Sequence, residues 1–236
     1  MNGSNIAPSI AAVCVAVQVA YAQPYPSKPI RIVTQYVPGS SGDNGLRFVT
    51  PFMSASMGQP VVIENRPGAG GVIAAETVMR SQPDGYSVLA GNSGTYVIRQ
   101  FLVKDMPFDP ARDFMPITQL PMAIGVLSGA APLIASGKLK LLAVVGSKRN
   151  GKFPQTPALA EAVPGFESPS SWTGIFGPAA LPMPLARRIS SEFAKATNDP
   201  ETKEKLINAG NEPVASTPEQ FAEAITKEIA LVRRIV

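Results

Sequence analysis

The sequence predicts an α/β fold in which helices cover a parallel sheet. Short β-branched runs alternate along the chain with segments whose apolar residues recur every three or four positions, the spacing of one helix face. Turn-forming residues such as Gly, Pro, Asn and Asp separate these segments. The chain has 236 residues, of which 45% are hydrophobic and 16% are charged. This length and composition favour a folded protein of one or two domains over a disordered one.

The first half of the chain shows a strand–helix–strand–helix–strand pattern. Leu46, Val49 and Met53 recur at helical spacing, and Gly58 follows as the expected C-cap. Such a pattern predicts parallel strands joined by helices that cover the sheet. The expected strands are residues 29–37, 60–64 and 86–90, and the expected helices are residues 42–57 and 69–80.

The second half is less regular but continues with both kinds of element. A helix is expected to begin after Thr217, with Thr217 as N-cap and Gln220 completing a capping box. A basic, polar loop is expected at residues 147–156. The expected strands or strand-like runs are residues 114–120, 122–126, 139–145, 172–176 and 212–215, and the other expected helices are residues 129–136, 182–196 and 199–210.

Composition excludes several classes of function. The chain contains no histidine, which removes the commonest general base and the commonest metal ligand. Its only cysteine is Cys14, so the rest of the chain offers no thiol nucleophile, disulfide or zinc cluster. The net charge of +4 is spread along the chain, which favours a solvated surface over a nucleic-acid interface. We expect no catalytic residues, metal or cofactor.

The first 22 residues resemble an export signal. The apolar stretch 6–19 is too short to span a bilayer, and Ala20-Tyr21-Ala22 is a small-x-small cleavage site before Gln23. No Lys or Arg precedes the apolar stretch, and a buried N-terminal helix is the alternative. We expect a signal peptide at residues 1–22, cleavage near Ala22-Gln23, and a soluble periplasmic protein.

Glycine- and serine-rich turns follow two of the expected strands. Gly42-Asp43 stands where a Walker loop needs Gly-Lys, and Ile73 stands at the third glycine of a dinucleotide fingerprint, so both nucleotide motifs fail. Without a histidine or a nearby lysine, no serine in these turns is activated as a nucleophile. Turns that lead from a strand into a helix still bind anions through free N–H groups. The candidate ligand-binding residues are Pro38, Gly39, Ser40, Ser41, Gly42 and Asp43 in one turn, and Asn92, Ser93, Gly94 and Thr95 in the other.

Each turn by itself is also consistent with an ordinary tight βα connection. Asp43 lies at an expected helix start, where capping of the helix explains a carboxylate as well as ligand contact does. Both turns should nevertheless lie at the same edge of the sheet, because parallel strands end there together. Their pairing favours a binding site.

Several longer motifs resemble one family. The stretches "QYVPGSSGDNGLR", "ENRPGAGG", "QPDGYSVLAGNSGT" and "VPGFESPSSWTGIFGPAALP" occur in the order found in the Bug family of extracytoplasmic solute receptors, which is related to the receptors of tripartite tricarboxylate transporters. The match covers nearly all of the chain after Gln23. The resemblance implies a periplasmic-binding-protein-like (type II) fold with two α/β lobes and a ligand cleft between them. It also implies a non-enzymatic receptor that delivers a small carboxylate-bearing metabolite to membrane transporter components. In the family, both turns named above line the cleft, and the first holds a ligand carboxylate by backbone amides and ordered waters.

The sequence departs from the family after Leu120. "PITQL" runs directly into "PMAIGVLSGAAPLIASGKLK", which indicates that most of the second lobe is deleted. We therefore expect one lobe from residues 23–120 and 169–236, and a remnant of the other from residues 121–168. Two-lobe receptors bind by closing both lobes on the ligand, so a single lobe should bind weakly or not at all. The alternatives are a degenerate, non-binding remnant and an enzyme that uses the anion-binding turns for group transfer.

Overall fold

The computed structural model describes residues 24–120, 133–145, 148–151, 153–163, 165–167, 171–209, 211, 213 and 215–235. The expected signal peptide and the apolar run 122–126 lie outside these residues.

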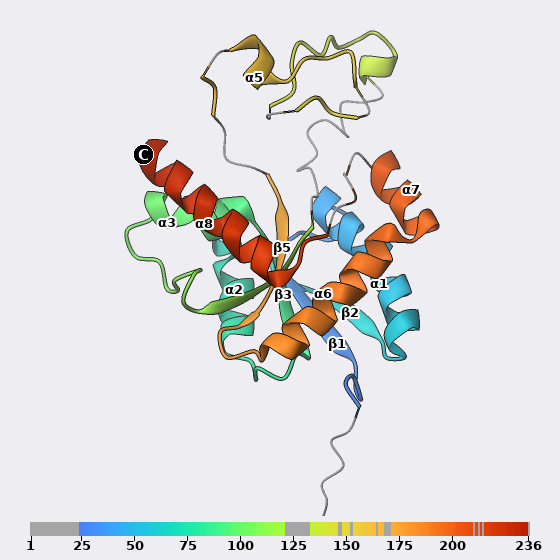
Figure 1. The fold of residues 1–236 in the computed structure, drawn as a ribbon, viewed down its shortest axis with the longest axis vertical. Helices are drawn as coiled ribbons and strands as arrows, with labels where there is room; N and C mark the ends of the chain where they lie inside the picture. The colour runs from blue at the N-terminus through green and yellow to red at the C-terminus, as the bar shows by residue number, and fades with distance from the viewer. Residues whose placement is uncertain are drawn as a thin grey trace, which may run out of the picture.

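A five-stranded sheet in the order β2-β1-β3-β5-β4 forms the centre of the molecule (Figure 1). β1 pairs in parallel with both β2 and β3, which confirms the parallel arrangement expected for the first half. The strands are β1 (Ile30–Thr34), β2 (Val61–Asn65), β3 (Ser87–Asn92), β4 (Phe114–Leu120) and β5 (Thr173–Pro178).

β5, from the second half, makes the sheet mixed, whereas the parallel arrangement was expected from the strands of the first half. It pairs antiparallel with β3 on one side and with β4 on the other. Leu120, at the end of β4, lies opposite Thr173, at the start of β5. β4 therefore ends and β5 begins at the same end of the strands, so β5 must run in the opposite direction to β4.

Helices cover both faces of the sheet. Ile32 points to a core shared with α1, α6 and α7, whereas its neighbour Val33 points to a second core shared with α2, η2 and α8. In Figure 1, α1, α6 and α7 gather on the right and α2, α3 and α8 on the left. The helices are α1 (Ser41–Met57), η1 (Ala69–Gly71, 3-10), α2 (Val72–Met79), η2 (Gly94–Ile98, π-helical), α3 (Arg99–Leu102), α5 (Leu159–Ala162), α6 (Met183–Asn198), α7 (Pro200–Asn208) and α8 (Pro218–Ile235).

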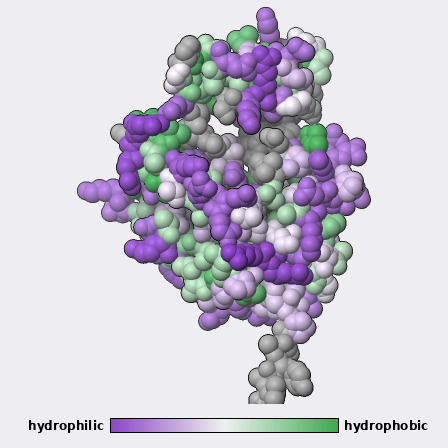
Figure 2. Space-filling model, in the orientation of Figure 1, coloured by the Kyte–Doolittle hydropathy of each residue, from purple (hydrophilic) through white to green (hydrophobic). Residues whose placement is uncertain are grey.

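Local sequence signals locate several helix ends correctly. Gly58 caps α1 in the left-handed conformation, with φ of 67°. The capping box at α8 is present: the Thr217 N–H donates to Gln220 Oε1 at 3.0 Å, and the Gln220 N–H donates to Thr217 Oγ1 at 3.2 Å. Figure 2 shows largely hydrophilic side chains on the outward sides of α6 and α8, as expected for helices that bury only one face.

The expected strand at residues 139–145 does not form. Only Val144 makes a bridge, to Ala158, in a segment that lies beyond the start of β5 in Figure 1. Of the helix expected at residues 129–136, the described part is helical at residues 133–135. Pro213 and Ala215 are not in a strand either. A strand needs neighbours to pair with, and none of the described residues here joins the five-stranded sheet.

The N-terminus of α1 is held by a buried carboxylate. Asp43 is fully buried, and its oxygens accept hydrogen bonds from the Gly39 N–H (2.9 Å), Asn65 Nδ2 (2.8 Å) and Arg47 Nε (2.7 Å). The N-cap, Ser40, accepts a bond from the Asp43 N–H. Burial by itself raises the pKa of Asp43, but the hydrogen bonds from Arg47, Asn65 and Gly39 outweigh burial and lower that pKa below 3.8.

Replacing Asp43 by Ala should lower the free energy of unfolding by about 2–3 kcal/mol at neutral pH, because two partly buried donors lose their acceptor and Arg47 loses its ion pair. The contribution of a carboxylate with a lowered pKa is present above its usual pKa and is lost as the pH falls through the lowered value. The difference between the variant and the unaltered protein, measured by urea unfolding, should therefore shrink in acid.

Asp199→Ala provides a matched control. Asp199 caps α7 through a 3.0 Å bond from the Thr202 N–H and has fewer partners, so its loss should cost only about 1 kcal/mol. A cost for Asp43→Ala no larger than that of Asp199→Ala would contradict the role assigned to Asp43.

A second buried carboxylate joins α8 to β5. The indole N–H of Trp172 donates to Glu228 Oε2 at 2.5 Å, whereas Glu228 Oε1 is buried without a hydrogen-bond partner. Burial raises the pKa of Glu228 from 4.5 to about 7, and the bond from Trp172 offsets only part of that rise. The folded state therefore favours a protonated Glu228.

Replacing Glu228 by Gln should stabilise the protein above pH 7, where the native carboxyl must be ionised at a buried position. The unfolded state loses this proton near pH 4.5 and the folded state near pH 7, so the gain should grow across that window. After discounting for solvent screening, we expect about 1–2 kcal/mol at its full extent. Thermal or urea unfolding across pH measures it.

Glu223→Gln on the same helix is the control, because Glu223 is exposed and paired with Lys227. The control should show no gain at high pH. Identical pH dependence of Glu228→Gln and the unaltered protein would show that Glu228 ionises normally in the fold.

Candidate functional site

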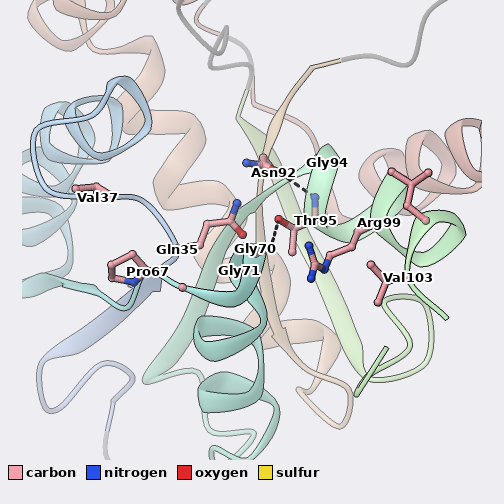
Figure 3. Close-up of a pocket in the computed structure, with 12 residues that line it drawn as sticks. Gln35, Val37, Pro67, Gly70, Gly71, Asn92, Gly94, Thr95, Arg99 and Val103 are labelled. Atoms are coloured by element: carbon pink, nitrogen blue, oxygen red, sulfur yellow. Dashed lines mark hydrogen bonds between the residues drawn. The ribbon is translucent and has the colours of Figure 1, made fainter. Parts of the chain in front are cut away.

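A cavity of about 530 Å³ opens at the edge of the sheet where β1 and β3 end. Thr34 and Ala90 are paired in register, so the residues that follow them emerge side by side. Figure 3 shows side chains from both segments facing this space, together with residues of η1 and α3. The lining residues are Gln35, Val37, Pro67, Gly68, Gly70, Gly71, Asn92, Gly94, Thr95, Arg99, Leu102 and Val103.

Glycines of η1 form one wall. Gly70 and Gly71 have φ of 64° and 98°, a region that residues with a side chain rarely adopt. A Cβ at Gly70 would overlap the Arg99 guanidinium, and one at Gly71 would overlap the Gln35 side-chain amide. The absence of these side chains lets Gln35 and Arg99 lie close to the backbone of the wall.

Asn92 and Thr95 join this wall to β3. Asn92 Oδ1 accepts a bond from the Thr95 N–H at 3.0 Å, and Thr95 Oγ1 donates to the Gly70 carbonyl at 2.9 Å, as drawn in Figure 3. The expected turn at residues 92–95 is therefore not a separate loop: Asn92 is the last residue of β3, and η2 begins at Gly94. Ser93 is buried, donates its N–H to the Trp172 carbonyl at 3.2 Å, and does not line this cavity.

The first predicted turn lies beside the cavity and does not line it. Its six residues, Pro38 to Asp43, are absent from the lining, where Gln35 and Val37 stand in their place. Ser41 begins α1, and Gly42 packs against the Tyr36 ring, which a Cβ would overlap. Of the ten candidate residues, the structure thus brings Asn92, Gly94 and Thr95 together in this cavity.

Tyr36 connects the first turn to β5. Its hydroxyl and Thr173 Oγ1 share a hydrogen bond of 2.5 Å. Burial raises the pKa of Tyr36 to about 12, so this phenol stays neutral. The residues after β1 are therefore fixed to the point where the chain re-enters the sheet.

Nine of the twelve lining residues were not among the candidates, and the two of these with polar side chains are Gln35 and Arg99. Gln35 follows β1 directly and Arg99 lies one helical turn after Thr95, so their spacing puts both near candidate residues, whereas tertiary packing turns their side chains into the cavity. Among the described residues, Arg99 is the only charged one in the lining. Buried atoms of both, Arg99 Nε and Gln35 Oε1, have no hydrogen-bond partner. Arg99 Nε is a donor and suits an anion, whereas Gln35 Oε1 is an acceptor and suits an N–H or O–H group of a ligand.

The described residues contain no cluster of three or more acidic, histidine or cysteine side chains that could hold a metal ion. In the same part of the chain, none of the helices combines the length and apolarity needed to cross a bilayer.

Comparison with known proteins gives consistent relatives. A protein from Bordetella bronchiseptica is 26% identical over 297 residues, covering 94% of this chain and 88% of the relative. The protein BugT of Bordetella pertussis is 24% identical over 288 residues, covering 88% of each chain. Both alignments are longer than the 236 residues of this chain, so the relatives contain residues without a counterpart here.

Solved structures share the fold. A structure described as a periplasmic transporter is 25% identical, with a TM-score of 0.75, covering 89% of this chain and 97% of the other. Two proteins of Rhodopseudomonas palustris are also similar. One, solved with adipate, is 21% identical with a TM-score of 0.76, covering 89% of this chain and 97% of the other. The second, MatC with bound malate, is 22% identical with a TM-score of 0.73, covering 89% and 99%.

The sequence profile of the family described as "Tripartite tricarboxylate transporter family receptor" matches residues 46–129 and, separately, residues 121–236. The two matches meet at residues 121–129, next to the expected break after Leu120. Together they span most of the chain, and the solved relatives are periplasmic binding proteins with the same α/β fold. The chain belongs to the tripartite tricarboxylate transporter receptor family.

Proposed function

We propose that this protein is a periplasmic receptor that captures a small carboxylate-bearing metabolite in the cavity at the ends of β1 and β3. The observation that carries the proposal is the charge of the lining: among the described residues it contains Arg99 and no acidic residue. Structural relatives with bound adipate and malate support a carboxylate as ligand. Membership of the receptor family supports delivery to the membrane components of a tripartite transporter and argues against the group-transfer enzyme.

Within the site, we propose that Asn92, Gly94 and Thr95 contact the ligand directly. The turn of Pro38 to Asp43 would shape the rim beside Val37. Asp43 already accepts bonds from Gly39, Asn65 and Arg47, which supports a role in holding this turn. Residues 1–22 would act as a signal peptide that is removed near Ala22-Gln23 during export.

We propose further that residues 23–120 and 169–236 form one lobe and residues 121–168 a remnant of the second. The pairing of Leu120 with Thr173 supports this division, because it makes the intervening residues a single excursion from the sheet. With little of a second lobe to close over the cavity, a bound carboxylate would stay partly hydrated. Contacts to a solvated anion contribute little free energy, so the deletion should impair binding.

Isothermal titration with a panel of adipate, malate, succinate and citrate tests the receptor function and its impairment. We expect at least one carboxylate to bind, with a dissociation constant of about a millimolar, corresponding to roughly −4 kcal/mol. Micromolar binding would contradict the impairment. No binding by any member would favour the degenerate, non-binding remnant.

A further inference from the structure

We infer that Arg99 selects the charge of the ligand by pairing its guanidinium with a ligand carboxylate seated beside Gly70. The inference rests on the proposed function. It names Arg99 as the residue that makes the cavity prefer a negatively charged ligand, and it names the ligand class as an aliphatic carboxylate.

Arg99 is an unpaired cation in the described part of the chain. Most other arginines described there form ion pairs, among them Arg31 with Glu64, Arg149 with Glu161 and Arg187 with Glu219. The Arg99 side chain has neither an ion pair nor a hydrogen bond to another described residue, and its Nε is buried without an acceptor. A buried donor of a charged group without an acceptor costs free energy, which a ligand anion would offset.

The space beside Arg99 fits a carboxylate. Figure 3 shows the guanidinium extending from α3 toward Gly70 and Thr95. Because Gly70 has no side chain, the planar guanidinium and a two-oxygen anion can both approach the backbone there. The Thr95 hydroxyl already donates to the Gly70 carbonyl, whereas the buried Arg99 Nε is a donor without an acceptor. Gln35 Oε1, also buried and unpartnered, lines the same cavity as an acceptor, so it would contact a donor group of the ligand and not its carboxylate.

The remaining wall next to Arg99 is apolar. Leu102 and Val103 follow Arg99 along the chain and line the cavity with Pro67. Leu102 is 69% exposed, so its side chain is accessible to the hydrocarbon part of a ligand. The geometry places the carboxylate at Arg99 and the hydrocarbon of the ligand along Leu102 and Val103.

The experiment compares hexanoate with hexanamide, which have the same carbon skeleton and differ in charge. NMR titration measures both dissociation constants in the millimolar range for the unaltered protein, Arg99→Gln, Arg99→Lys and Arg80→Gln. Arg80 is an exposed residue at the opposite end of α2, so Arg80→Gln makes the same change in net charge away from the cavity. Since the Arg99 side chain makes no hydrogen bond or ion pair with the described residues and its buried Nε is unsatisfied, Arg99→Gln should melt at a temperature no lower than that of the unaltered protein.

We expect the unaltered protein and Arg80→Gln to prefer hexanoate over hexanamide. Arg99→Gln should lose about tenfold in affinity for hexanoate and nothing for hexanamide, and Arg99→Lys should keep part of the preference. Unchanged preference in Arg99→Gln would overturn the assignment of Arg99 while leaving the receptor function standing. If neither hexanoate nor any carboxylate of the panel binds the unaltered protein, both proposals are overturned.

Discussion

The antiparallel pairing of β5 with β3 and β4 holds the two halves of the chain together. It brings a strand from the second half of the chain into the middle of a sheet begun by the first half. Trp172 and Phe176 enter the core with it, where they pack against Phe221 of α8. Without this strand, β4 would have no partner and α8 would lose its contacts with Trp172 and Phe176 in the core. The C-terminal third of the chain is therefore attached to the fold both through β5 and through α6 and α7, which share a core with α1.

The same strand also determines the shape of the cavity. Tyr36 reaches from the end of β1 to Thr173, and the Ser93 N–H reaches the Trp172 carbonyl just before β5. Both segments that border the cavity are thus fixed to the point where the chain re-enters the sheet. Four of the twelve lining residues are glycines, and half of the others are apolar, so few polar side chains define its chemistry. Arg99 supplies its charge, and Asn92 and Thr95 hold its walls together.

The break in the family pattern lies where the chain leaves the central sheet. The family profile splits at residues 121–129, and β4 ends at Leu120. Residues lost between β4 and β5 fall between two strands that remain paired with each other, so every strand of the central sheet keeps its partner. This explains how a chain shorter than its relatives keeps the central fold with TM-scores above 0.7.

Elements with local signals could be predicted from the amino-acid sequence. The helix face of Leu46, Val49 and Met53, the C-cap at Gly58 and the capping box at Thr217 depend on neighbours within a few residues, and each was predicted correctly. The motifs of the chain likewise identify its family, because each motif is a short continuous stretch. Strand direction is different, because hydrophobic pattern does not encode which edge a strand enters from. The direction of β5 and the absence of a strand at residues 139–145 depend on pairing between distant segments.

The candidate site shows the same contrast between local sequence signals and contacts between distant segments. The two glycine-rich turns are visible in the sequence, and the parallel register places them at one edge of the sheet. Packing across long separations sets which of their residues face the cavity: Gly42 lies against Tyr36, Asp43 against Asn65, and Gly70 against Thr95 and Arg99. A residue's position in a motif is local information, whereas the direction of its side chain depends on distant neighbours. Sequence alone therefore establishes the family and the edge that holds the site, whereas the placement of Gln35 and Arg99 in the cavity lining follows from tertiary packing.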